Sequence, residues 1–180
     1  MPNLKTIIKD AMGSDDITYY FPHAKIYQYK ELRKYKSIAH LLPKKPDFAF
    51  ILYEDSPQSG HWTVLTRDSN NNINYFDSYG GKPDHPLTWY STTDRIKLDQ
   101  NVCYLSHLLN STPEQVYYND EDYQKNGMDV ATCGRHACFY VMNMLQYHMS
   151  LQDYHTFMNK MKKKHKMSYD EVVSSFIDKM

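Results

Sequence analysis

The most constraining feature of this sequence is a cysteine placed where a loop gives way to a long apolar run. The run, residues 137–149, combines Phe, Tyr, Val, Met and Leu without proline or glycine, so it predicts a buried helix. Cys133, followed by glycine, would lie at the N-terminus of that helix, where unpaired backbone N–H groups and the helix dipole favour a negative charge. Because a thiolate carries such a charge, the pattern predicts a reactive thiol, with an inert buried thiol as the alternative.

Length and charge narrow the classes of protein that this chain fits. Its 180 residues suffice for a single domain, 1–180, with a core of its own. Lys and Arg total 21, as do Asp and Glu, so the net charge of +0 gives no general attraction to nucleic acid or membranes. The one basic run, residues 160–166, is interpreted as the solvated end of a helix. We therefore expect no membrane and no required nucleic acid among the partners.

The cysteines indicate a reducing compartment rather than a disulfide framework. There are three of them, an odd number, and the N-terminus lacks the apolar core of a secretory signal. Cys103 and Cys138 fall within apolar helical stretches, which predicts inert core thiols. Cys133, His136 and Cys138 lie close together in sequence, but zinc requires a second pair of ligands that the chain does not offer. We expect neither a metal nor a cofactor.

Hydrophobic periodicity places strands in the middle of the chain and helices mainly towards its end. Strands are predicted at residues 48–53, 62–66, 73–76 and 115–119. Helices are predicted at residues 3–12, 98–109, 137–149, 151–165 and 168–179. Ser168 and Glu171 form a capping box for the last of these helices. This grouping indicates an α+β fold without an internal linker.

A base for the thiol is predicted at one edge of the sheet. The strands on either side of the Asn-rich turn, residues 68–72, predict an antiparallel hairpin. His61 precedes the first strand and Asp77 follows the second, so the hairpin would set them side by side. An imidazole oriented by a carboxylate is what a cysteine nucleophile needs. The alternatives are an ordinary strand-end histidine and a turn-forming aspartate.

Several short motifs follow one another along the chain: Gly60-His61-Trp62, Phe76-Asp77-Ser78, then Gln124 upstream of Cys133-Gly134. In kind and in order, they resemble the motifs of the adenovirus-protease and SUMO-protease superfamily of cysteine proteases. The run from Tyr123 to Asp129 resembles the Gln-x-Asn-Gly-x-Asp sequence of SUMO proteases. Thr132-Cys133-Gly134-Arg135-His136 is more similar to the maturation proteases of virophages and large DNA viruses. The resemblance spans about residues 48–145.

The resemblance implies a fold and a set of catalytic roles. The fold would be a central, mostly antiparallel sheet packed between helices, with the nucleophile at the N-terminus of a buried helix. Cys133 would be the nucleophile and His61 the general base, oriented by Asp77. Gln124 would donate to the oxyanion together with the backbone N–H of Cys133. Because the spacer before Cys133 is longer than in SUMO proteases, Asn126 is the alternative donor.

The resemblance also implies substrate contacts. Trp62, next to the base, would narrow the substrate groove, and Gly134, next to the nucleophile, would line it. A narrow groove admits small residues, so cleavage after glycine, as at Gly-Gly-x sites, is expected.

The function expected from these features is a viral cysteine endopeptidase that cleaves capsid or core precursors during virion maturation. We expect a monomer that acts in the virion and in the host-cell cytoplasm. A peptide activator is a possible further partner. One alternative is a deconjugating protease for a ubiquitin-like modifier. Others are an acetyltransferase, although no basic pocket for an acyl cofactor is evident, and a catalytically silent, protease-like binding module.

Overall fold

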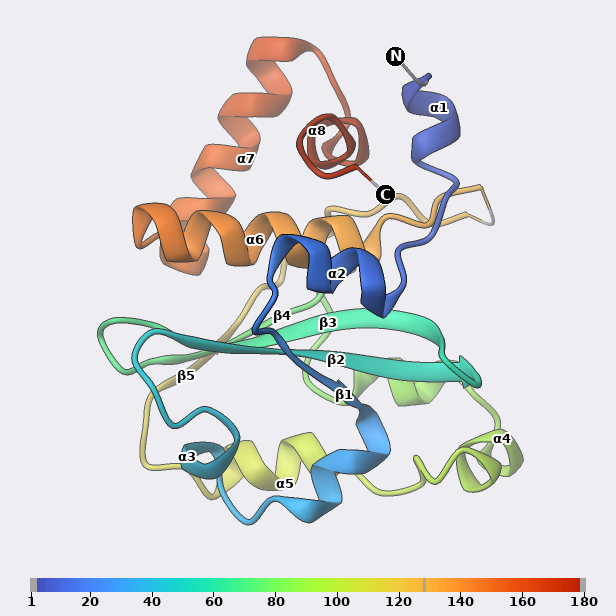
Figure 1. Cartoon of the computed structure of the whole chain (residues 1–180), viewed down its shortest axis with the longest axis vertical. Coiled ribbons are helices and arrows are strands. Elements are labelled where there is room, and N and C mark those ends of the chain that lie inside the picture. The colour runs from blue at the N-terminus through green and yellow to red at the C-terminus, as the bar shows by residue number, and fades with distance from the viewer. Residues whose placement is uncertain (1–2, 128, 179–180) are drawn as a thin grey trace.

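A mixed five-stranded sheet lies between two layers of helices (Figure 1). The computed structural model describes residues 3–127 and 129–178. Along the chain, its elements are α1 (Leu4–Ile7), α2 (Ser14–Tyr20), β1 (Lys25–Gln28), η1 (Tyr29–Lys34), α3 (Ile38–Leu41), β2 (Asp47–Ser56), β3 (Ser59–Arg67), β4 (Ile73–Phe76), η2 (His85–Trp89), α4 (Thr92–Lys97), α5 (Tyr104–Asn110), β5 (Val116–Tyr118), α6 (Cys133–Tyr147), α7 (Leu151–His165) and α8 (Tyr169–Phe176).

The strands lie in the order β1-β2-β3-β4-β5. The two central pairs, β2–β3 and β3–β4, are antiparallel, whereas β1–β2 and β4–β5 are parallel. The long strand β2 is apolar on both faces, with Phe50, Ile51 and Leu52 in succession, because helices cover the sheet from both sides. The predicted α+β class is confirmed; the sheet is antiparallel at its centre and parallel at its edges.

Each face of the sheet has its own hydrophobic core. On one face, α2, α6, α7 and α8 pack over the strands, as the upper layer of Figure 1 shows. Phe76 of β4 stacks on Tyr140 of α6 there, with ring centroids 4.6 Å apart and planes 8° from parallel. On the other face, η1, α3 and α5 cover residues such as Ile51 and Leu65. The first of these layers carries the N-terminus of α6 and therefore places Cys133.

Most of the predicted elements are confirmed. Strand β4 occupies residues 73–76 and the β3–β4 hairpin is antiparallel, as expected. Helix α6 begins at Cys133, and α7 spans the predicted residues 151–165. The capping box of α8 is present, since Ser168 and Glu171 each accept a hydrogen bond from the other's backbone N–H. Residue 179, the last of that predicted helix, lies outside the described residues.

Two predicted helices are wrong in part. The helix expected over residues 98–109 is broken, because Asp99 adopts a left-handed φ of 56° between α4 and α5. Cys103 consequently lies at the N-cap of α5 and is exposed, not in the core. The helix expected over residues 3–12 ends at Ile7. Met128, inside the Gln-x-Asn-Gly-x-Asp run, lies outside the described residues.

None of the helices described between residues 3 and 178 is both long and apolar enough to cross a bilayer.

We expect Phe76→Ala to lower the free energy of unfolding by about 3–5 kcal/mol, because it removes a fully buried ring from the stack that holds α6 to the sheet. Phe176→Ala is the matched control, since Phe176 is 51% exposed, and it should cost about 1 kcal/mol. Urea unfolding monitored by circular dichroism measures both. Equal losses would contradict the central place of the Phe76 stack.

Candidate active site

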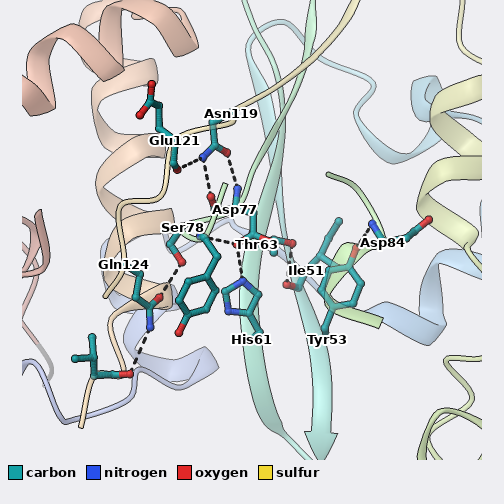
Figure 2. Close-up of polar contacts among 12 residues, drawn as sticks. Ile51, Tyr53, His61, Thr63, Asp77, Ser78, Asp84, Asn119, Glu121 and Gln124 are labelled. Atoms are coloured by element: carbon teal, nitrogen blue, oxygen red, sulfur yellow. Dashed lines mark hydrogen bonds and ion pairs between the residues drawn. The ribbon is translucent and has the colours of Figure 1, made fainter. Parts of the chain in front are cut away.

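The site forms where β4 stops and β3 continues. The β3–β4 ladder covers Val64 to Arg67 of β3, so the beginning of β3 extends past the end of β4. His61 lies on that extension, and Asp77 follows the last residue of β4. Nε2 of His61 is 2.8 Å from Oδ1 of Asp77, as Figure 2 shows, and both side chains are buried. The predicted side-by-side placement of His61 and Asp77 is confirmed.

Asn119 fixes the backbone on which Asp77 is carried. Its Oδ1 accepts from the N–H of Asp77 at 2.8 Å, and its Nδ2 donates to the carbonyl of Asp77 at 2.7 Å. The same Nδ2 also donates to the carbonyl of Glu121 (Figure 2). The N–H of Tyr79 donates to Oδ1 of Asp77 at 2.9 Å. Asn119 was not predicted; the available signal was a polar residue at the end of the strand that would neighbour β4.

The side chains of Cys133 and His61 are hydrogen-bonded to each other. With Nε2 bonded to Asp77, Nδ1 is the ring nitrogen left for the hydrogen bond to Cys133. Burial raises the pKa of the Cys133 thiol, but the hydrogen bond and charge of His61 and the N–H groups of Trp62 and Gly134 outweigh it and lower the pKa. Burial lowers the pKa of His61, but Asp77 and Cys133 together raise it to about 10. Both shifts favour a thiolate–imidazolium pair over a neutral thiol and imidazole.

Ser78 holds Gln124 in place. The hydroxyl of Ser78 donates to Oε1 of Gln124 at 2.8 Å, and the carbonyl of Ser78 accepts from the N–H of Gln124 at 2.9 Å (Figure 2). Because Oε1 is occupied, the amide presents Nε2 as a donor; it makes a long contact of 3.4 Å to the carbonyl of Val130. Gln124 is 3% exposed, whereas Asn126, the alternative donor, is exposed. The oxyanion role of Gln124 stays a prediction, and this geometry favours it over Asn126.

Trp62 and Gly134, which are neighbours of His61 and Cys133 in the sequence, pack against each other. The indole N–H of Trp62 donates to the carbonyl of Met12 at 2.9 Å. A Cβ added at Gly134 would lie 2.9 Å from Cβ of Met12 and 3.3 Å from Cδ1 of Trp62, so this approach requires glycine. Trp62 also lines a surface hollow of about 510 Å³ between α2, β1 and β2. The substrate contacts expected of Trp62 and Gly134 stay predictions.

An aromatic wall, formed by Tyr79 and Trp89, encloses the imidazole. Tyr79 stacks on His61 with centroids 5.2 Å apart, and Trp89 meets the same ring edge-on at 5.0 Å. Burial, followed by the nearby charge of Cys133, raises the pKa of Tyr79 to about 12, so it stays neutral beside the thiolate. Trp89 is 43% exposed and faces solvent on its outer side. Neither residue was predicted, since their contact with His61 depends on the course of the loop after β4.

Asp84 anchors the loop that carries Trp89. Its Oδ1 accepts from the hydroxyl of Tyr29 at 2.6 Å, and its Oδ2 accepts from the N–H of Ser106 at 2.8 Å. Its own N–H donates to the hydroxyl of Tyr53 at 3.3 Å (Figure 2). The aromatic wall is thereby fixed to the core on the other face of the sheet. Among residues 3–127 and 129–178, no three His, Cys, Asp or Glu side chains gather as a metal site would require.

Comparisons with known proteins bear on the family and on the fold of the chain. No protein-family model matches the sequence. The uncharacterized protein V9 of the Sputnik virophage is 33% identical over 175 residues, which cover 97% of this chain and 98% of V9. The structure of ChlaDub1 from Chlamydia trachomatis superposes with a TM-score of 0.52 at 16% identity, covering 98% of this chain and 93% of that one. This likeness shows that the chain has a ChlaDub1-like, protease-like fold. The central domain of Lpg1148 from Legionella pneumophila gives a TM-score of 0.40, too low to bear on the fold.

We expect iodoacetamide to modify Cys133 faster than Cys103, although Cys103 is the more exposed thiol. The lowered pKa of Cys133 favours its thiolate and displaces its rate–pH profile to lower pH than that of an ordinary thiol. Cys138 should react most slowly, because burial raises its pKa. Mass spectrometry of the alkylated peptides measures all three rates.

His61→Ala is the control for that experiment. It removes the hydrogen bond and the charge that lower the pKa of Cys133 but leaves the burial that raises it. The profile of Cys133 should therefore move to higher pH in this variant. An unchanged profile would show that His61 does not activate the thiol.

Proposed function

The chain belongs to the same family as protein V9 of the Sputnik virophage, and we propose that it is a cysteine endopeptidase of the adenovirus-protease and SUMO-protease superfamily. The observation that carries the proposal is the buried arrangement in which Asp77 orients His61 and His61 activates Cys133. A structural ion pair has no need of a thiol with a lowered pKa at a helix N-terminus, whereas acyl transfer requires one.

In the proposed mechanism, the Cys133 thiolate attacks the scissile carbonyl carbon, and the carbonyl π electrons move to its oxygen. The resulting tetrahedral intermediate collapses, the C–N bond breaks, and the imidazolium of His61 gives its proton to the leaving amine. Neutral His61 then takes a proton from water, which attacks the thioester and releases the acid product and the thiolate. Asp77 keeps Nδ1 directed at the reaction through both steps.

The oxyanion would be held by groups that are present before substrate binds. Cys133 is the first residue of α6, so its backbone N–H has no partner within the helix. Nε2 of Gln124 is the second donor in the proposal, oriented by Ser78 through Oε1. Both donors sit in surroundings from which water is largely excluded, where such hydrogen bonds stabilise developing charge most strongly.

We propose cleavage after glycine in extended polypeptides. Its support is the large indole of Trp62, which follows His61 directly and is held in place by Met12 and by its close packing against Gly134. The hollow that Trp62 lines offers a path for the residues before the cleaved bond. Gly-Gly-x is the simplest sequence with these properties.

We further propose that the natural substrates are capsid or core precursors of a virus and that the enzyme acts as a monomer at the site of virion assembly. The support is the family relationship to a virophage protein over nearly the whole chain. Deconjugation of a ubiquitin-like modifier is the competing function. It differs because the substrate is then a folded modifier whose C-terminal tail contains the cleaved bond.

We expect the wild-type protein to cleave a Gly-Gly-x peptide, and Cys133→Ala and His61→Ala to abolish turnover while both variants remain folded. Asp77→Asn should retain measurable activity, because it removes the orienting carboxylate but neither reacting group. Liquid chromatography of the peptide products measures cleavage, and circular dichroism checks the fold.

Two further substrates are tested in the same assay: precursor polypeptides of a virion, and a ubiquitin-like protein that carries a C-terminal extension. Cleavage of the extension alone, with intact precursors, would replace the endopeptidase proposal by deconjugation. If the wild type and Cys133→Ala both leave every substrate intact, the result would favour the alternative of a protease-like binding module.

We expect Gln124→Ala to lower kcat by about 10²–10³-fold, the usual cost of losing one oxyanion donor. Asn126→Ala, in the same loop, is the matched control and should leave kcat within about twofold. Steady-state hydrolysis of the Gly-Gly-x peptide measures both. The opposite order of effects would assign the donor to Asn126.

A further inference from the structure

A buried carboxylate outside the catalytic trio joins two segments that carry catalytic groups. Asp170, in the first turn of α8, accepts at Oδ1 from the hydroxyl of Thr132, and Nε2 of His136 lies 3.1 Å from the same oxygen. Its Oδ2 accepts from the backbone N–H of Lys125 at 3.0 Å. All three contacts reach across the chain from the region of the nucleophile to α8.

Two of these donors are direct neighbours in the sequence of residues with proposed catalytic roles. Lys125 directly follows Gln124, and Thr132 directly precedes Cys133. Asp170 therefore ties together the two ends of the loop that separates the proposed oxyanion donor from the nucleophile. The same loop is the spacer that is longer than in SUMO proteases. Because of its length, the sequence alone does not decide whether Gln124 or Asn126 donates to the oxyanion.

The tie is strong because the carboxylate is charged and largely removed from water. Thr132 and His136 are fully buried and Asp170 is 4% exposed. Burial raises the pKa of Asp170, but His136, Thr132 and the N–H of Lys125 outweigh it and lower the pKa. A buried charge that lost these partners would be costly, so the three donors and the carboxylate hold one another in place.

We propose that Asp170 is a positioning residue that fixes Gln124 relative to Cys133 and thereby sets the oxyanion site. This inference rests on the proposed peptidase function. Asp170 touches no reacting atom, so its effect is on the alignment of the transition state and not on the thiolate, which His61 and nearby backbone N–H groups activate. A misplacement of about 1 Å in such a site can lower the rate about 10²-fold.

Capping of α8 is the simpler role that the experiment must separate from this one. Glu171, the next residue, already forms the reciprocal capping box with Ser168 and is exposed. Glu171→Gln removes one negative charge from the first turn of α8, as Asp170→Asn does, but leaves the tie untouched. Asp170→Asn changes one acceptor into a donor that faces the donors around it.

The test compares peptide hydrolysis with iodoacetamide alkylation of Cys133 in folded protein. Hydrolysis needs both the thiolate and the oxyanion site, whereas alkylation needs only the thiolate. We expect Asp170→Asn to lower kcat for the Gly-Gly-x peptide by about 10²-fold, with KM and the alkylation rate within about threefold of wild type. Glu171→Gln should leave all three quantities within about twofold.

Thr132 provides a second pair of variants in case Asp170→Asn does not fold. Thr132→Val removes one donor to Asp170 with little change in shape and should lower kcat, whereas Thr132→Ser keeps the hydroxyl and should restore it. Equal hydrolysis by Asp170→Asn and Glu171→Gln, or by the two Thr132 variants, would overturn the role of Asp170. So would a parallel loss of hydrolysis and alkylation. Failure of the wild type to hydrolyse any substrate would instead overturn the proposed function itself, and this role with it.

Discussion

The packing of α6 across one face of the sheet is the contact on which the rest of the site depends. Cys133, the proposed nucleophile, belongs to this helix, and His61, its proposed base, belongs to the sheet. The distance between the two side chains therefore depends on how firmly the helix is packed against the sheet. The Phe76–Tyr140 stack holds the middle of the helix. At its beginning, Gly134 allows Met12 and Trp62 to approach more closely than any side chain would permit. Rigid packing of this kind transmits a displacement of the helix directly to Cys133.

The charged groups of the site, His61 and Asp77, are stabilised by partners that come from other elements of the fold. The imidazolium of His61 faces the carboxylate of Asp77, whose backbone is clamped by Asn119 near the end of β5. Tyr79 stacks on the imidazole and Trp89 meets it edge-on, so the aromatic wall limits hydration and lays the face of Tyr79 over the cation. A buried ion pair alone is weak support for a fold, but this one also orients the imidazole that is hydrogen-bonded to Cys133.

Local sequence patterns predicted those parts of the molecule that local chemistry determines. Strand β4 and helix α6 were predicted because alternation and an unbroken apolar run are visible over a few residues. The His61–Asp77 pair followed from the hairpin, since an Asn-rich turn fixes which strand ends meet. The break near Asp99 carries no comparable signal, because a left-handed aspartate is not marked by proline or glycine. Asn119 and Trp89 were missed because tertiary structure alone brings them to the site.

The tie made by Asp170 has a consequence for the timing of activity during synthesis. Helix α8 leaves the ribosome after every other described element, so a nascent chain can expose His61 and Cys133 while the loop before Cys133 is still unfastened. On the proposed role of Asp170, the oxyanion site of such a chain is unformed. Docking of α8, whose residues Val172 and Val173 also belong to the core around α6, is then the folding step that completes the site.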